Sequence, residues 1–90
     1  MLFLPKEVET VITTLQGAGY SPYLVGGCVR EVLRGKAPSD YDMTSDALPQ
    51  EVLRLFGEWA HPTGLQHGTV TVVSGGLPIE LTTMRRGGAY

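Results

Sequence analysis

The apolar positions of the first 35 residues repeat with two spacings, which predict a helix, a strand and a second helix. The first helix is expected to begin at Pro5 and to end at Gly17, because the apolar residues between them recur every three or four positions. The short apolar run at residues 23–25 predicts a buried strand. A turn at residues 26–27 then leads into a short helix that should end at Gly35. The apolar faces of the two helices are Val8, Val11, Ile12 and Leu15, and then Val29, Val32 and Leu33.

The middle of the chain combines strand alternation with a third helical stripe. Residues 40–43 alternate between polar and apolar, so we expect a half-buried strand with Tyr41 and Met43 facing the core. Asp46 is expected to cap the next helix, whose first turn contains Pro49. The stripe of this helix should pack in the core, and it consists of Val52, Leu55, Phe56 and Trp59.

The last third of the chain predicts a β-hairpin. Residues 68–73 alternate valine with threonine, and residues 78–85 place apolar side chains on the face opposite Glu80. The Ser-Gly-Gly segment at 74–76 supplies the turn between them. The expected order is helix, strand, helix, strand, helix, strand, strand. This order predicts an α/β or α+β domain in which helices flank a small mixed sheet.

Composition limits the class of protein. With 90 residues the chain is one small domain at most, and its 42% hydrophobic content excludes a disordered tail. No apolar run approaches the roughly 18 residues needed to span a membrane. The single cysteine, Cys28, excludes a disulfide framework and a multi-cysteine zinc site, and it fits a reducing cytoplasm.

Charge argues against a dedicated nucleic-acid binder. Seven Lys and Arg residues against nine Asp and Glu residues give a net charge of −2, whereas such binders carry a basic surplus. An RNA partner would therefore need basic surface from elsewhere. Neither histidine is expected to do chemistry, since His61 falls in a predicted loop and His67 should order the turn before a strand. Cys28 is expected to be a small packing residue.

The glycine pair Gly26-Gly27 is the first candidate for chemistry. It joins a predicted strand to a predicted helix, and two glycines allow a ligand to approach the backbone closely. Free N–H groups at the start of the helix, with Arg30 in its first turn, would suit a phosphate. The alternative is an ordinary tight turn beside a solvated arginine, because the pattern is neither a dinucleotide-binding fingerprint nor a Walker loop.

The second candidate is the pair Asp40 and Asp42. Residues two apart on a strand point to the same side, so two carboxylates would lie close together and repel each other unless a cation sits between them. Magnesium, which takes one or two carboxylates plus substrate phosphates, fits this arrangement. One alternative is a solvated acidic strand end. Another is a calcium loop, but Ser45 stands where that loop requires glycine.

Glu80 is the third candidate. If the hairpin packs beside the strand that carries the two aspartates, Glu80 can join them, and three carboxylates on neighbouring strands could hold two metal ions. The alternative is a surface glutamate on a solvated sheet face.

In combination these motifs resemble a known family. The matching segments are Tyr-Leu-Val-Gly-Gly-Cys-Val-Arg-Glu at 23–31, Ser-Asp-Tyr-Asp-Met at 39–43, His-Gly-Thr-Val-Thr at 67–71 and Ile-Glu-Leu-Thr-Thr-Met-Arg at 79–85. They resemble the N-terminal head of the bacterial-type (class II) tRNA nucleotidyltransferases, which are the CCA-adding enzymes, and of their poly(A) polymerase relatives. Both belong to the DNA polymerase beta-like superfamily.

The resemblance implies a function and a role for each candidate residue. It implies transfer of nucleotides from CTP or ATP to the 3′ end of tRNA by two-metal catalysis with magnesium. Contacts to tRNA would come from domains outside this chain. The implied triphosphate-binding residues are Gly26, Gly27 and Arg30, and the implied catalytic and metal-binding residues are Asp40, Asp42 and Glu80.

The chain also departs from the family it resembles. Glu31 stands where the family usually has aspartate, and the stretch Arg86-Gly87-Gly88 lacks an acidic residue that is usual near Gly87. Later family motifs are absent, so we expect residues 1–90 to be one head domain and a fragment of a longer protein. Apolar surface exposed by truncation would favour self-association. The alternatives are a poly(A) polymerase head, a stand-alone minimal nucleotidyltransferase, or a non-catalytic nucleotide-binding or structural piece.

Overall fold

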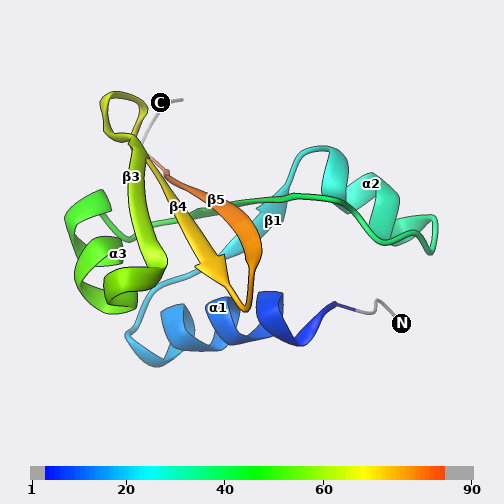
Figure 1. Ribbon diagram of the computed structural model, residues 1–90, viewed down its shortest axis with the longest axis horizontal. Helices are drawn as coiled ribbons and strands as arrows, with labels where there is room; N and C mark the ends of the chain where they lie inside the picture. Colours follow the sequence, from blue (N-terminus) through cyan, green and yellow to red (C-terminus); the bar gives the residue numbers. More distant parts are fainter. Residues whose placement is uncertain (1–3, 85–90) are drawn as a thin grey trace.

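A five-stranded mixed sheet forms the centre of the molecule (Figure 1). The structure is a computed structural model that describes residues 4–84. Its elements in chain order are α1 (Lys6–Gly17), β1 (Tyr23–Val25), α2 (Gly27–Leu33), β2 (Tyr41–Ser45), α3 (Pro49–Phe56), the short 3-10 turn η1 (Gly57–Trp59), β3 (Ala60–Gly64), a second turn η2 (Leu65–His67), β4 (Thr69–Ser74) and β5 (Leu77–Thr83). The predicted mixed sheet with flanking helices is confirmed.

The order of strands brings β5 next to β2. Across the sheet the order is β1, β2, β5, β4, β3, and only the pair of β2 with β5 is parallel. In this pair Asp42 lies opposite Glu80 and Tyr41 lies opposite Ile79. In β2, β4 and β5 the side chains alternate between a buried face toward the helices and an open face that is exposed or half-buried. The hairpin therefore packs where the carboxylate hypothesis requires it.

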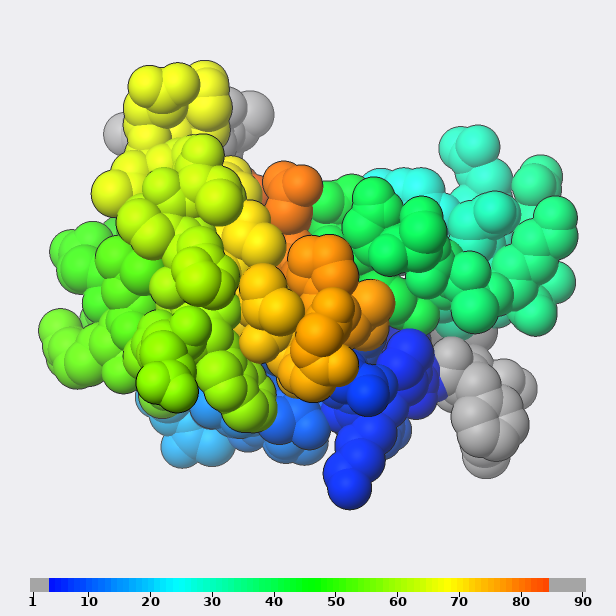
Figure 2. Space-filling view, viewed as in Figure 1, coloured from blue at the N-terminus to red at the C-terminus, as the bar shows by residue number. Residues whose placement is uncertain are grey.

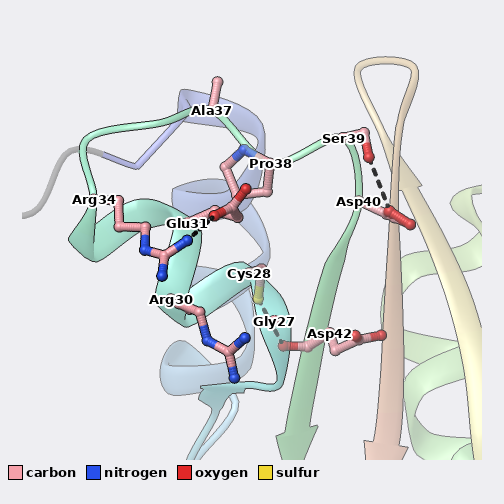
Figure 3. A pocket seen from close by; sticks show the side chains of 10 residues that line it. All are labelled: Gly27, Cys28, Arg30, Glu31, Arg34, Ala37, Pro38, Ser39, Asp40 and Asp42. Carbon is pink, nitrogen blue, oxygen red and sulfur yellow. Dashed lines mark hydrogen bonds and ion pairs between the residues drawn. The ribbon is translucent and has the colours of Figure 1, made fainter.

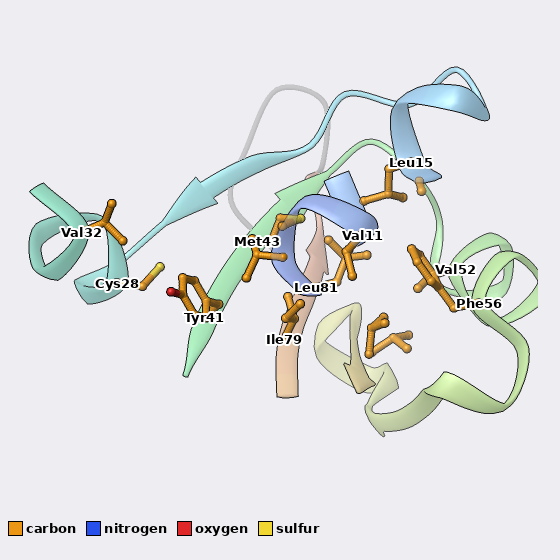
Figure 4. Close-up of a cluster of buried hydrophobic side chains, with 14 residues drawn as sticks. Val11, Leu15, Cys28, Val32, Tyr41, Met43, Val52, Phe56, Ile79 and Leu81 are labelled. Atoms are coloured by element: carbon orange, nitrogen blue, oxygen red, sulfur yellow. The ribbon is translucent and has the colours of Figure 1, made fainter. Parts of the chain in front are cut away.

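One hydrophobic core lies between the sheet and its helices (Figure 4). The apolar residues of β2, β4 and β5 point into it, and the predicted stripe of α1 covers them. Burial raises the pKa of the Tyr41 hydroxyl above its ordinary value of 10.0. The hairpin turn lies against the start of α1 (Figure 2), where the Ser74 hydroxyl donates to the Glu7 carbonyl at 2.9 Å. The fully buried side chains of the core include Val8, Val11, Leu15, Met43, Val70, Val72, Ile79 and Leu81.

Two of the expected helical features are wrong. Asp46 does not cap α3, because its carboxylate accepts a hydrogen bond from the Ser21 N–H at 2.8 Å instead. The helix begins at Pro49, and the Glu51 carboxylate accepts from the Leu48 N–H at 2.8 Å. Trp59 is not in the core, since α3 ends at Phe56 and the tryptophan lies 42% exposed on the following 3-10 turn.

The two outer strands also differ from expectation. Residues 23–25 form β1 but are not buried, because β1 lies at the edge of the sheet and Tyr23 is 55% exposed. The opposite edge strand, β3, was not predicted, since Ala-His-Pro-Thr-Gly shows no alternation and contains a proline. Proline is tolerated on an edge strand because its missing N–H faces solvent. His61 therefore lies on a strand and not in a loop.

Two of the three residues expected on the apolar face of the second helix pack against the core, since Val32 is buried and Val29 is partly buried. Cys28 and Val32 are the buried residues of α2, whereas Leu33 is 67% exposed. This helix packs at the β1–β2 end of the sheet (Figure 1). A narrow stripe of buried side chains on the helix is enough to cover that end. The end of the predicted last strand, Arg85, lies outside the described residues.

A buried hydroxyl links the end of β5 to the segment that follows β2. Thr83 is 5% exposed, and its hydroxyl donates to the carbonyl of the fully buried Ala47 at 2.6 Å. We expect Thr83→Val, which keeps the side-chain shape, to leave that carbonyl unpaired and to lower the free energy of unfolding by about 1–3 kcal/mol. Chemical denaturation measures the change.

Thr82→Val is the matched control on the same strand. Thr82 is half-buried on the open face, where its hydroxyl pairs with that of Thr69 at 2.9 Å. Water can replace that partner, so the change should stay within about 0.5 kcal/mol. Equal effects of the two substitutions would contradict the importance of the buried hydrogen bond.

Candidate active site

A hollow opens between α2 and the segment that leads into β2 (Figure 3). Its volume is about 610 Å³. Four of the six residues predicted for the site line it, together with others that the sequence analysis did not single out. The complete lining is Gly27, Cys28, Arg30, Glu31, Arg34, Ala37, Pro38, Ser39, Asp40 and Asp42.

Gly26 and Asp42 approach each other closely at one end of the hollow. Gly26 has φ 79° and ψ −159°, a conformation that is essentially restricted to glycine. A Cβ atom placed on Gly26 would lie 3.2 Å from Oδ2 of Asp42, which is tighter than ordinary van der Waals contact. The glycine therefore allows the turn and also leaves room for the aspartate carboxylate.

The buried side chain of Cys28 connects the start of α2 to the two neighbouring strands. Its thiol donates to the Val25 carbonyl at 3.1 Å and lies 3.7 Å from the Asp42 carbonyl. The first turn of α2 is thereby tied to both β1 and β2. Cys28 is buried, so the prediction that it serves packing is confirmed.

Both aspartates line the hollow, and their carboxylates point away from α2, toward β5 (Figure 3). Asp42 lies on β2 and is exposed, while its neighbours Tyr41 and Met43 are buried as predicted. Asp40 lies in the bend just before β2, and it accepts a hydrogen bond from the Ser39 hydroxyl at 3.4 Å. The segment Tyr41–Ser45 is a strand in the sheet and not a loop, so the calcium-loop alternative is wrong.

Glu80 lies beside Asp42 but outside the lining of the hollow. The two residues are direct partners in the parallel pair of β2 and β5, and both are exposed on the open face. Neighbouring strands are about 4.8 Å apart, so the two side chains start from adjacent positions. In the part of the chain that the structure describes, however, no three His, Cys, Asp or Glu side chains are gathered closely enough to hold a metal ion. The three-carboxylate set therefore stays a prediction.

Positive charge lies on the α2 side of the hollow. Arg30 lines it from α2, and Arg34 lines it from the position directly after that helix (Figure 3). Arg34 was not among the predicted site residues. Its spacing of four from Arg30 places both on one helix face, which is the signal that could have identified it.

The remaining candidate residues lie away from this hollow. His67 is exposed on η2, where its ring lies 3.3 Å from the Gln66 side-chain amide. His61 is exposed on β3. Arg85, Arg86 and Gly87 lie outside the described residues. Among the helices in residues 4–84, none is both long enough and apolar enough to cross a membrane.

Known proteins similar to this chain agree on one family. A family model described as the poly A polymerase head domain matches residues 22–90. A CCA-adding enzyme from Oceanobacillus iheyensis is 46% identical over 84 residues, which are 93% of this chain and 21% of that protein. The chain thus spans about a fifth of the length of the curated relatives it matches.

Solved structures show the same similarity in three dimensions. The structure of the Bacillus stearothermophilus CCA-adding enzyme in complex with CTP is 38% identical, with a TM-score of 0.81 over 91% of this chain and 21% of that one. A tRNA nucleotidyltransferase complexed with a primer tRNA and an incoming ATP analog is 31% identical, with a TM-score of 0.65. That match covers 89% of this chain and 24% of the other.

Proposed function

The chain belongs to the poly(A) polymerase head domain family, and we propose that it is the nucleotide-binding head of an enzyme that transfers nucleotides from CTP or ATP to the 3′ end of tRNA. One observation carries the proposal. The hollow beside α2 is lined by Arg30 and two aspartates and lies next to a glycine turn, in a chain similar to a CCA-adding enzyme that was solved with CTP.

The triphosphate would lie along α2. Gly27 has no heavy atom within 4 Å of the position of a Cβ, so a ligand can approach its backbone. Arg30 offers a planar fork of donors that suits phosphate oxygens. Together they would bind the phosphates and orient the α-phosphorus toward the aspartates. The chain's own residues thus contribute mainly positioning, which dominates catalysis of phosphoryl and nucleotidyl transfer.

The aspartates suit a divalent metal, which the family implies. Asp40 and Asp42 are exposed residues of the lining, and carboxylate oxygens are the ligand type that magnesium prefers. Among the described residues, no Lys, Arg or His forms a salt bridge with either of them. When bound there, magnesium would neutralise phosphate charge and lower the pKa of an attacking hydroxyl. We propose Asp40 and Asp42 as its ligands, with Glu80 as the third carboxylate of a two-metal site.

The proposed reaction forms one bond and breaks another. The 3′-hydroxyl of the tRNA would lose its proton to water as its oxygen forms a bond to the α-phosphorus, and the bond from that phosphorus to pyrophosphate would break. Arg30 would stay with the departing phosphates, because it lines the hollow on the side opposite the aspartates. With a net charge of −2, this chain would leave most contacts to tRNA to other parts of a longer protein.

Calorimetric titration with CTP and ATP tests the proposed function. Because charged groups for phosphates line the hollow, we expect the two nucleotides to bind with similar affinity in the presence of magnesium. Removal of magnesium with a chelator should weaken both by about tenfold or more, since phosphate and carboxylate would then repel each other. If neither nucleotide binds, or if binding ignores magnesium, the proposed function is wrong.

A further inference from the structure

The hollow continues past Arg30 to Arg34, the residue directly after α2. Its lining runs from Gly27 to Arg34 and then returns along the loop to Asp40. Arg30 and Arg34 are one helical turn apart, which is about 6 Å along the axis. Like charges at this spacing disfavour the helix slightly, so the sequence places them together at a small cost in stability. Two guanidinium groups in one hollow suit a chain of phosphates better than a single phosphate.

We propose that Arg34 binds the terminal phosphate of the nucleotide and makes the site select triphosphates over diphosphates. The inference rests on the proposed function, since it extends the same nucleotide site. Arg30 lies nearer the glycine turn and Arg34 lies one turn farther from it, so a phosphate chain that starts at Asp42 meets Arg30 first. A diphosphate would end before it reaches Arg34.

Arg34 forms an ion pair with Glu31 that a phosphate can replace. Oε2 of Glu31 lies 3.9 Å from Nη1 of Arg34, and the side chains are 40% and 63% exposed. An ion pair this long and this exposed contributes little stability, so a phosphate can replace the carboxylate easily.

The test compares ATP with ADP, each with magnesium, on three proteins. We expect Arg34→Gln to weaken ATP binding by about tenfold, the size of one lost charge-assisted hydrogen bond, and to change ADP binding less than twofold. The wild-type preference for ATP over ADP should shrink accordingly. Arg54→Gln, an equal change of charge at an exposed position on α3 outside the hollow, should leave both affinities unchanged. Thermal melting confirms that both variants fold.

The outcomes separate this inference from the proposed function. If the wild-type chain binds ATP with magnesium but Arg34→Gln weakens ATP and ADP equally, Arg34 acts only through general charge and the inference is wrong. An unchanged ATP affinity overturns it as well, and leaves the proposed function standing. If the wild-type chain binds neither nucleotide, the proposed function itself fails, and the inference fails with it. Arg34→Lys should recover part of the lost ATP affinity, because it restores the charge without the planar fork.

Discussion

Asp42→Asn is expected to weaken binding of CTP with magnesium by about 100-fold, because the proposed metal site would lose one of its carboxylate ligands. Asp42 is the residue on which the features of the site converge. It lines the hollow, lies against Gly26 and is the strand partner of Glu80. The substitution preserves size, so the fold should remain intact. Calorimetric titration of both proteins measures the difference.

Asp46→Asn is the control for this experiment. It makes the same change of charge and shape at an exposed aspartate outside the hollow, and the asparagine oxygen can still accept from the Ser21 N–H. Its nucleotide affinity should equal that of the wild type. A merely structural role for Asp42 predicts a different result, in which the two variants bind alike and only stability changes. Relief of repulsion between Asp40 and Asp42 would then stabilise the fold.

Gly26→Ala is expected to lower both stability and nucleotide binding. Alanine in the conformation of Gly26 costs about 1–3 kcal/mol, which is a large share of the roughly 5–10 kcal/mol typical of a small domain. The new methyl group would also press on the Asp42 carboxylate at 3.2 Å and displace it from its present position. Chemical denaturation and titration with CTP measure the two effects separately.

Gly27→Ala tests nucleotide binding without the loss of stability that is expected for Gly26→Ala. Gly27 has an ordinary helical conformation and open space around it, so alanine there should leave stability unchanged or slightly higher. If the triphosphate lies against this backbone, the added methyl group should still weaken CTP binding. Unaltered binding in Gly27→Ala would remove that glycine from the site. If Gly26→Ala is as stable as the wild type, the claim that alanine is strained in the conformation of Gly26 is wrong.

The parts of the fold that follow from local pattern were predictable from the sequence. Alternation around Asp42 placed Tyr41 and Met43 in the core, and the glycine pair at 75–76 located the hairpin turn, where both residues have positive φ. The position of Glu80 could be stated only as a condition, because pairing of β5 with β2 depends on contacts between residues far apart in sequence. The structure meets that condition.

Other features depend on tertiary packing that no local pattern reveals. The edge strand β3 has neither alternation nor β-branched enrichment, and it exists because β4 offers it a partner. Trp59 lies outside the core because Gly57, with φ 58°, ends the helix before the stripe is complete. The spacing of Arg34 from Arg30 places both on one helix face, but it does not reveal that residues 37–40 return alongside α2 to complete the hollow.

Nuclear magnetic resonance of the labelled chain, titrated with CTP and magnesium, tests the central claim most directly. A protein of 9.7 kDa suits the method, and the backbone amide signals report where the ligand lies. The account predicts that the largest shifts fall on Gly26, Gly27, Arg30, Asp40 and Asp42, and that they disappear when a chelator removes the metal. Shifts centred on another surface, or none at saturating nucleotide, would contradict the assignment of this hollow as the nucleotide site.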